Sequence, residues 1–326
     1  MTILVTGGAG YIGAHVVRLL RQRGERVVVV DDLSTGSASR IGDEPLVRLD
    51  LAAPEAVAVL TDAMLEHKVA AVIHFAARKQ VGESVAKPAW YYQQNVGGMA
   101  NLVQAMENAR VDRLVFSSSA ATYGQPDVGL VTEDMAGAAI NPYGETKVIG
   151  EWLGRAAGVA WGCRFVALRY FNVAGAGWPE LGDPAVLNLV PMVLDKLELG
   201  EKPRVFGDDY PTPDGTCIRD YIHVLDLAKA HLAALDYLDQ EERPHDAFNV
   251  GTGTGSSVKE VIDEIGRASG LDVTSEVLPR RAGDPARLVG SPELIEKTLG
   301  WRAEAGLSEI IASAWEAWQT GPRHIG

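Results

Sequence analysis

Tyr143 and Lys147 carry the clearest chemical signal in the sequence. They stand at positions i and i+4 of the segment Tyr143-Gly144-Glu145-Thr146-Lys147, so on a helix their side chains share one face. A tyrosine phenol has a pKa of about 10, too high for a base at neutral pH. A neighbouring ammonium group stabilises the phenolate and lowers that pKa. The spacing therefore predicts that Tyr143 is a general base whose pKa is lowered by Lys147.

A run of serines precedes this pair. Phe116-Ser117-Ser118-Ser119 ends an apolar run that predicts a buried strand. In open parallel sheets, ligands bind at the carboxyl ends of the strands. The hydroxyl of Ser119 at that edge is suited to donate to a substrate oxygen and to relay its proton. The three residues together predict acid–base catalysis beside a hydride acceptor.

A glycine-rich turn near the start of the chain predicts where that acceptor binds. The segment Thr6-Gly7-Gly8-Ala9-Gly10-Tyr11-Ile12-Gly13 follows a predicted strand and opens a predicted helix. Glycines in this position allow a tight turn and a close approach of the backbone to a pyrophosphate, which the helix N-terminus then attracts. The segment therefore predicts a dinucleotide site.

Acidic residues at the ends of the next strands bear on which dinucleotide binds. Asp31 follows the run Arg26–Val30, eighteen residues after Gly13. A carboxylate there bonds the ribose hydroxyls and repels a 2′-phosphate, so it favours NAD over NADP. Asp32 is able to share this role. Asp50 and Leu51 are candidates to flank the adenine, although an aspartate that merely closes a strand is equally compatible with the pattern.

The elements that position these residues alternate between strands and helices. Apolar, β-branched runs predict strands at Ile3–Thr6, Arg26–Val30, Ala71–Phe75, Leu114–Ser117 and Phe165–Tyr170. Helical patterns between them cover Val16–Gln22, Val57–Leu65, Val96–Asn108 and Tyr143–Ala156. Such alternation predicts an α/β fold with a doubly wound, Rossmann-type parallel sheet.

The pattern loosens after Asn172, where Gly, Pro and Asp are frequent. Two helices are predicted in this part, at Asp226–Tyr237 and Val258–Ser269. We expect an NAD-binding domain at 1–171, with a segment around 217–240 returning to it. A smaller C-terminal substrate-binding lobe is expected over 172–326.

Composition excludes several classes of function. The formal net charge of −13 over 326 residues disfavours nucleic-acid binding, which needs a basic surface. Two cysteines, Cys163 and Cys217, form neither a disulfide framework nor a zinc pattern. No signal peptide and no membrane span are evident, so we expect a cytoplasmic protein without nucleic-acid, membrane or metal partners.

The sequence resembles the UDP-glucose 4-epimerases, a branch of the extended short-chain dehydrogenases, over nearly its whole length. The Thr6–Gly13 turn, His74–Ala77 and the Tyr143/Lys147 pair are shared with the wider group. Segments closer to the epimerase branch are Ala77–Val85, the region of Asp209-Tyr210-Pro211, and Arg219–Val224. Further matching stretches are Ser117–Gly124, Leu168–Asn172 and Arg280–Asp284.

The resemblance implies roles for individual residues. Those implied to contact NAD are Gly7, Gly10, Tyr11, Ile12, Gly13, Asp31, Asp32, Asp50, Leu51, Phe75, Ala76, Ala77, Lys79, Asn95, Ser117, Tyr143, Lys147 and Tyr170. Those implied to contact a UDP-sugar are Lys79, Ser119, Tyr143, Phe171, Asn172, Asn188, Leu189, Arg204, Phe206, Arg219, Tyr221, Arg281, Asp284 and Leu288. Two arginines suit a diphosphate, because a guanidinium fork matches phosphate oxygens. A surface charge at Arg281 and a structural ion pair between Arg219 and Asp220 remain alternatives.

The resemblance also implies an activity. It implies interconversion of UDP-glucose and UDP-galactose by transient oxidation at sugar C4, and a homodimer formed through the helices around Val96–Asn108 and Tyr143–Ala156. Leu288 falls where some epimerases carry a large aromatic residue and others a small one, and we expect non-acetylated UDP-hexoses as substrates. Epimerisation of UDP-pentoses, UDP-glucuronate or UDP-N-acetylhexosamines stays open. A 4,6-dehydratase is disfavoured because Ala120, Ala121 and Thr122 stand where those enzymes carry an acid pair. A non-catalytic NAD-binding protein is disfavoured because both Tyr143 and Lys147 are present.

Overall fold

The computed structural model of the chain divides into two compact units. It describes residues 1–135, 137–240, 243, 245–281 and 283–321. The first unit comprises Met1–Gly124, Glu133–Arg169 and Ala228–Phe248. The second comprises Gln125–Thr132, Tyr170–Leu227 and Asn249–Gly326. Each unit is thus assembled from segments that are distant in the sequence.

A seven-stranded sheet with the strand order β11-β6-β5-β4-β1-β2-β3 organises the first unit. Its strands are β1 (Thr2–Thr6), β2 (Arg26–Asp31), β3 (Leu46–Arg48), β4 (Ala71–His74), β5 (Arg113–Ser117), β6 (Arg164–Tyr170) and β11 (Ala247–Val250). The five pairs from β3 to β6 are parallel. The winding direction reverses at β1, which is where ligands bind in sheets of this type. The predicted doubly wound parallel sheet is confirmed.

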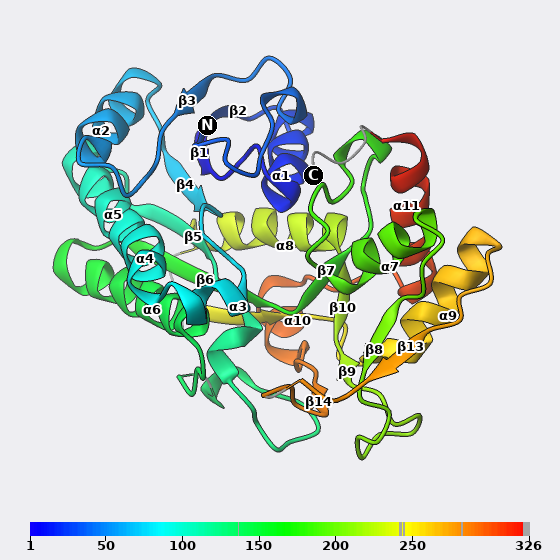
Figure 1. Ribbon diagram of the computed structural model, residues 1–326. Helices are drawn as coiled ribbons and strands as arrows, with labels where there is room; N and C mark the ends of the chain where they lie inside the picture. Colours follow the sequence, from blue (N-terminus) through cyan, green and yellow to red (C-terminus); the bar gives the residue numbers. More distant parts are fainter. Residues whose placement is uncertain (136, 241–242, 244, 282, 322–326) are drawn as a thin grey trace. The chain divides into compact units, whose positions relative to one another are not determined.

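Helices cover both faces of this sheet. Figure 1 shows α2 (Ala56–Glu66), α5 (Gly98–Ala109) and α6 (Pro142–Trp161) packed side by side on one face, and α1 (Tyr11–Gln22) on the other. Apolar residues of α2 and α5, including Leu60 and Leu102, form a buried cluster with the sheet. Further elements of this part of the chain are η1 (Ala38–Arg40), α3 (Val81–Ala86), α4 (Pro88–Tyr91), η2 (Tyr92–Gly97), η3 (Ala120–Tyr123), η4 (Glu133–Met135) and α8 (Val224–Tyr237).

The ends of α6 are fixed by its sequence. The Asn141 side chain accepts a hydrogen bond from the backbone nitrogen of Gly144 at 2.9 Å, and Pro142 occupies the first turn. An asparagine cap followed by proline is a favoured helix start. The helix ends at Gly162, which adopts a left-handed conformation. Tyr143 and Lys147 therefore lie in the first two turns, at a position set by the cap.

Two glycines allow α6 to lie close against the sheet. A Cβ atom at Gly150 would come within 2.6 Å of the Phe116 ring, and one at Gly154 within 2.2 Å of the Phe165 ring. Contacts this short leave no room for a methyl group. Since Lys147 and Gly150 belong to the same helix, this close packing also sets how near the Lys147 side chain comes to the end of β5.

We expect Gly150→Ala to lower the free energy of unfolding by roughly 1–3 kcal/mol, the usual effect of overpacking a core. Urea denaturation measures this change. Gly97→Ala is the matched control, because its Cβ would have no atom within 4 Å and Gly97 is already helical. We expect this control to be neutral or stabilising by about 0.4–1 kcal/mol. Equal stability losses in the two variants would contradict the packing argument.

The described residues of the second unit form short strands and four helices. Strands β7 (Asn172–Ala174) and β10 (Tyr221–His223) pair in parallel, as do β8 (Arg204–Phe206) and β13 (Glu276–Leu278). A third sheet has the order β12 (Ser256–Ser257), β9 (Ile218–Arg219), β14 (Arg287–Leu288). The helices are α7 (Leu189–Glu198), α9 (Val258–Ser269), α10 (Glu293–Leu299) and α11 (Leu307–Thr320), with one 3-10 turn, η5 (Pro179–Leu181). In the described part of the chain, no helix combines the length and hydropathy that crossing a bilayer requires.

Candidate active site

The glycine turn between β1 and α1 is shaped for close backbone approach. Gly7 has a φ of 69°, a conformation that residues with a Cβ rarely adopt. A Cβ at Gly7 would lie 2.7 Å from the Ala76 nitrogen, and one at Gly13 would lie 2.2 Å from the Gly7 oxygen. Helix α1 begins after Gly10, and no described side chain caps this end. The turn thus presents a helix N-terminus to a pyrophosphate, as a dinucleotide requires.

Asp31 anchors this turn at the end of β2. Its two carboxylate oxygens accept hydrogen bonds from the backbone nitrogens of Ala9, at 3.0 Å, and Leu33, at 2.9 Å. Burial raises the pKa of Asp31, and this effect outweighs the two hydrogen bonds, which act to lower the pKa. Asp32 is engaged differently, in an ion pair with Arg78 at 2.7 Å. Carboxylate lone pairs of Asp31 are still available to ribose hydroxyls.

Asn95 links the loop after β4 to α6. It lies on η2, a turn of π-helix, a feature frequent at functional sites. Its side-chain nitrogen donates to the Arg78 carbonyl and to the Thr146 hydroxyl, both at 3.0 Å, and its side-chain oxygen accepts from the Arg78 nitrogen at 2.8 Å. The loop after β4 is therefore tied to the helix that carries Tyr143 and Lys147.

The other predicted NAD contacts of this unit have varied surroundings. Asp50 is exposed and accepts a hydrogen bond from the Gln94 amide at 3.2 Å. Leu51 is buried in the hydrophobic core, and the Phe75 ring packs 4.6 Å from the His231 ring. Tyr11 is buried, Ile12, Ala76 and Ala77 are partly buried, and Lys79 is exposed.

Ser119, Tyr143 and Lys147 are brought together at the end of β5. The Lys147 Nζ donates to the Ser117 carbonyl at 2.8 Å and lies 5.9 Å from the centre of the Tyr143 ring. Ser119 caps η3 by accepting from the Ala121 nitrogen at 3.1 Å. Its hydrogen bond to Tyr143 lowers the pKa of the phenol. The structure thus joins in space the three residues predicted to perform the acid–base chemistry.

Burial opposes the charged forms of the Tyr143/Lys147 pair. Tyr143 is 8% exposed and Lys147 is 4% exposed. Burial raises the pKa of Tyr143 and lowers the pKa of Lys147 to about 8, while the Glu151 carboxylate acts to raise the latter. A phenolate and a neighbouring ammonium stabilise one another. Whatever keeps the proton on Lys147 therefore favours the phenolate.

His74 lies beneath this pair as a neutral, packed group. Its Nδ1 is 2.6 Å from the Thr6 hydroxyl, and its ring stacks 5.7 Å from Phe116. Burial, and secondarily the Lys147 charge, lower the pKa of His74 to about 3. His74 is thus uncharged at neutral pH and does not compete with Lys147 as a cation.

In the second unit, Arg219 lies beside two other predicted substrate contacts. Its Nη2 is 3.4 Å from the Asp284 carboxylate. Leu288 on β14 is the partner of Arg219 on β9 in the parallel ladder between these strands. The adjacent Asp220 instead accepts hydrogen bonds from the backbone nitrogens of Thr252, at 2.8 Å, and Gly253, at 3.1 Å. Arg219 is therefore paired with Asp284 rather than with Asp220.

Phe206 and Arg281 form a second group in this unit. The Arg281 guanidinium lies 3.7 Å from the centre of the Phe206 ring, which is a cation–π contact. The neighbouring Arg280 is paired with Asp209 at 2.6 Å, whereas Arg281 has no ion pair among the described residues. Stacking leaves the edge of the Arg281 guanidinium available to phosphate oxygens.

The remaining predicted substrate contacts are spread over the second unit. Asn188 precedes α7 and donates to Asp183 at 3.0 Å, and Arg204 is exposed, 3.8 Å from Glu276. Tyr221 belongs to the core of the unit. Tyr170, Phe171, Asn172 and Leu189 are partly buried.

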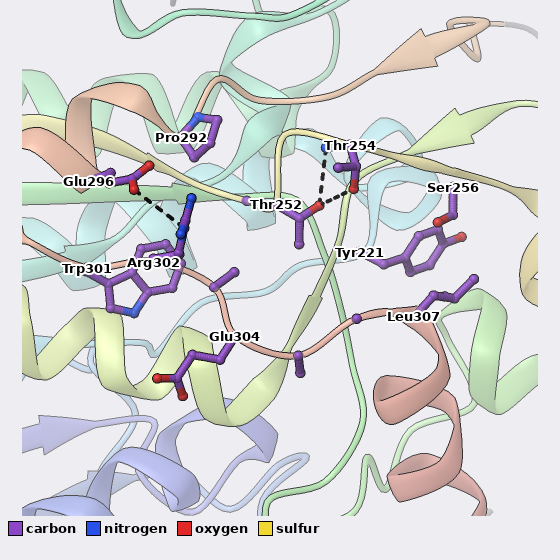
Figure 2. A pocket seen from close by; sticks show the side chains of 14 residues that line it. Tyr221, Thr252, Thr254, Ser256, Pro292, Glu296, Trp301, Arg302, Glu304 and Leu307 are labelled. Carbon is purple, nitrogen blue, oxygen red and sulfur yellow. Dashed lines mark hydrogen bonds and ion pairs between the residues drawn. The ribbon is translucent and has the colours of Figure 1, made fainter.

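A cavity of about 280 Å³ opens beside Tyr221, within the second unit (Figure 2). Figure 2 shows Tyr221 near Ser256 and Leu307, with the Arg302–Glu296 ion pair on another wall. Among the described residues lining the cavity, Tyr221 alone belongs to the predicted substrate contacts. The cavity is therefore separate from the Arg219 and Arg281 groups.

Three charged residues with several polar contacts escaped the sequence analysis. Arg78 bonds Asp32, Gln94 and Ser34, and Glu151 and Arg169 form a buried ion pair at 2.6 Å. Only the i+4 spacing from Lys147 to Glu151 hinted at any of these contacts. Among the described residues, no cluster of His, Cys, Asp and Glu could hold a metal ion.

The chain is similar to proteins of known family. The profile of the NAD dependent epimerase/dehydratase family matches residues 3–251. The UDP-glucose 4-epimerase of Corynebacterium glutamicum is 44% identical, over 97% of this chain and 95% of that protein. A crystal structure of a UDP-glucose 4-epimerase matches all of both chains with a TM-score of 0.94 and 43% identity.

A second solved structure contains ligands. The UDP-glucose 4-epimerase of Stenotrophomonas maltophila, with bound NAD and formylated UDP-arabinopyranose, matches with a TM-score of 0.92 and 40% identity, covering 98% of each chain. The family profile spans well over half of the chain, and the similarity to relatives extends over nearly all of it. The chain belongs to the NAD dependent epimerase/dehydratase family.

Proposed function

We propose that this protein is an NAD-dependent UDP-glucose 4-epimerase, which interconverts UDP-glucose and UDP-galactose. The observation that carries the proposal is the buried Tyr143/Lys147 pair, with Ser119 bonded to the phenol, in the same unit as a glycine turn suited to a pyrophosphate. Relatives about 44% identical over 97% of the chain carry this name, which supports the choice of substrate.

The residues of the first unit divide the chemistry among them. When bound, NAD would supply the hydride acceptor and donor for C4 of the sugar. Tyr143 takes the proton of the 4-hydroxyl, directly or through Ser119, and gives it back after inversion. Lys147 stabilises the phenolate, and the Ser117 carbonyl holds the ammonium in place.

Residues of both units bind the two ligands. In the first unit, Gly7 and Gly13 admit the pyrophosphate of NAD and Asp31 bonds the adenosine ribose. In the second, Arg219 and Arg281 bind the UDP diphosphate. Because UDP is bound firmly and the sugar loosely, the 4-keto sugar can rotate in the site while the UDP group stays bound. This places the binding energy away from the reacting carbon.

Isotope labelling tests this mechanism. With UDP-galactose in D₂O, the hydrogen at C4 is transferred as hydride and returned, so we expect UDP-glucose without deuterium at C4 by proton NMR. Deuterium at C4 would show proton abstraction from carbon and contradict transient oxidation. A 4-keto-6-deoxy product would indicate a dehydratase, which is disfavoured because η3 offers Ala120, Ala121 and Thr122 in place of an acid pair.

The proposed preference for sugars without an N-acetyl group rests mainly on one residue, Leu288. Solved relatives include a UDP-Glc/GlcNAc 4-epimerase from Campylobacter jejuni, 39% identical over 98% of this chain, so acetylated substrates are a specific second candidate. Leu288 is bulkier than the small residue expected of such enzymes. We expect turnover of UDP-N-acetylgalactosamine to be slower than that of UDP-galactose, and equal rates would contradict the role given to Leu288.

The proposal extends to assembly and location. Trp152 is 60% exposed and Val159 is 92% exposed, seven residues apart on one face of α6. Large exposed apolar side chains on one face are typical of an interface, which supports a homodimer through α6 and α5. Cys163 and Cys217 are free thiols, as expected in a reducing cytoplasm.

We expect Trp152→Glu to convert the dimer to a monomer, because the charge would have to be desolvated in the interface. Light scattering after size-exclusion chromatography measures the molar mass. The control is Trp90→Glu, which places the same charge on α4. A dimeric Trp152→Glu variant, or a monomeric wild type at micromolar concentration, would contradict this interface.

A further inference from the structure

Glu151 is a buried carboxylate with several partners and no role in the mechanism so far. It lies one helical turn after Lys147 on α6 and is 2% exposed. Its Oε1 accepts from the Ser118 hydroxyl at 2.7 Å and from the Arg169 Nε at 2.8 Å. Its Oε2 accepts from the Arg169 Nη2 at 2.6 Å and from Arg155 at 3.3 Å. Burying a carboxylate so completely is unfavourable unless it is paired and hydrogen-bonded.

The bond to Ser118 joins Glu151 to the run of serines that also contacts the catalytic pair. Ser117, Ser118 and Ser119 are consecutive, and each makes a different contact. The Ser117 carbonyl accepts from Lys147, the Ser118 hydroxyl donates to Glu151, and Ser119 bonds Tyr143. Two successive turns of α6 are thus fastened to two successive residues at the end of β5.

Among the described residues, the titratable groups that act on Lys147 are Tyr143 and Glu151 on α6 and the neutral His74 on β4. Arg169 on β6 is connected to Lys147 through Glu151. Arg155 reaches Glu151 from the exposed side of α6, where its shorter bond, at 2.6 Å, is to Asp246. Arg169 is 3% exposed and is held by both oxygens of Glu151. Without Glu151, Lys147 and Arg169 would be buried cations with no carboxylate between them.

We propose that Glu151, clamped by Ser118 and Arg169, is a positioning residue that keeps the proton on Lys147 and thereby leaves Tyr143 as the phenolate. This inference rests on the proposed function, since it assigns a role within the same acid–base pair. The two arrangements to compare are phenolate with ammonium, and phenol with neutral amine. They contain the same number of protons, and a carboxylate beside the lysine favours the first.

Loss of the Glu151 charge and loss of the Arg169 charge should move the proton between Lys147 and Tyr143 in opposite directions. Glu151→Gln keeps the shape of the side chain but removes its charge, so the proton moves from Lys147 towards Tyr143. Arg169→Gln removes the cation that offsets Glu151, so the proton is held more firmly on Lys147. Arg155→Gln is the matched control, because Arg155 is a partly exposed guanidinium on the same carboxylate.

The test is the ultraviolet absorbance of the Tyr143 phenolate in the purified enzyme without substrate. The chain has nine tyrosines, so the spectrum of Tyr143→Phe is subtracted in each background. At pH 8, where Lys147 titrates, we expect Glu151→Gln to lower the ratio of phenolate to phenol by about tenfold, the equivalent of one pKa unit. We expect Arg169→Gln to raise the ratio and Arg155→Gln to change it less than twofold.

The inference would be overturned if Glu151→Gln and Arg169→Gln changed the ratio of phenolate to phenol in the same direction. It would also be overturned if neither changed the ratio more than Arg155→Gln does. If Glu151→Gln does not fold, Arg169→Gln decides alone: a rise in phenolate supports the role, and a fall or no change refutes it. The readout needs no substrate, so a failure to epimerise UDP-galactose would leave this result standing. A purely structural role would lower the unfolding temperature without opposite changes in phenolate.

Discussion

Replacing Tyr143 by phenylalanine is expected to lower kcat by about 10²–10⁴-fold, the usual contribution of a positioned general acid–base group. Phenylalanine keeps the ring, which is 8% exposed, and removes only the hydroxyl that Ser119 bonds. The binding of NAD and the free energy of unfolding should change little. Steady-state turnover of UDP-galactose measures the effect, and fluorescence or absorbance of the purified protein measures bound cofactor.

Tyr237→Phe is the matched control for this variant. Tyr237 is also buried and its hydroxyl donates to the His245 carbonyl at 2.9 Å, but it is bonded to none of the catalytic residues. We expect this control to retain near-normal turnover. A Tyr143→Phe variant with turnover within tenfold of the wild type would remove Tyr143 from the role of base.

Replacing Lys147 by methionine is expected to produce the second-largest effect, also about 10²–10⁴-fold near neutral pH. Methionine fills the space of the lysine stem but offers no charge to the phenolate and no donor to the Ser117 carbonyl. Without the ammonium, the pKa of Tyr143 returns towards the raised value that burial imposes. The rate should therefore fall most at low pH and recover in part as the pH rises.

A pH profile of kcat/KM distinguishes this effect from general damage. In the wild type, the alkaline limb should reflect loss of the Lys147 proton. Burial lowers the pKa of Lys147 to about 8, and the positive charge of the bound cofactor acts on the same group. In Lys147→Met that limb should be absent and the acid limb should lie at higher pH. The control is the exposed Lys259→Met. A uniform loss of rate at every pH would contradict the role assigned to Lys147.

The sequence was sufficient to predict elements whose local signals agree with their tertiary surroundings. Helix α6, predicted over Tyr143–Ala156, spans Pro142–Trp161, and α9 has the bounds of the predicted helix, Val258–Ser269. The buried parallel strands were recognisable because both of their faces are covered, so their residues are continuously apolar. The short strands of the second unit were missed, since two or three residues are too few to show a period.

The interactions around the predicted catalytic residues were harder to anticipate. Glu151 and Arg169 are eighteen residues apart in sequence, and their pairing depends on how closely α6 packs on β6. Arg78 and Asp32 likewise meet only because the loops after β4 and β2 follow neighbouring parts of one sheet. Tyr221, a predicted substrate contact, belongs to the core of the second unit and lines a cavity there. Motifs thus predicted residue types with chemistry, but the networks that set their charge states require the fold.

The most direct test of the central claim is to incubate the purified protein with UDP-galactose, without added cofactor, and to follow UDP-glucose by a coupled dehydrogenase assay. The account predicts that UDP-glucose forms, because NAD stays bound to the protein through turnover. It also predicts that the Tyr143→Phe protein forms almost none. If no UDP-glucose forms even when NAD is supplied, the assignment of UDP-glucose and UDP-galactose as substrates is wrong.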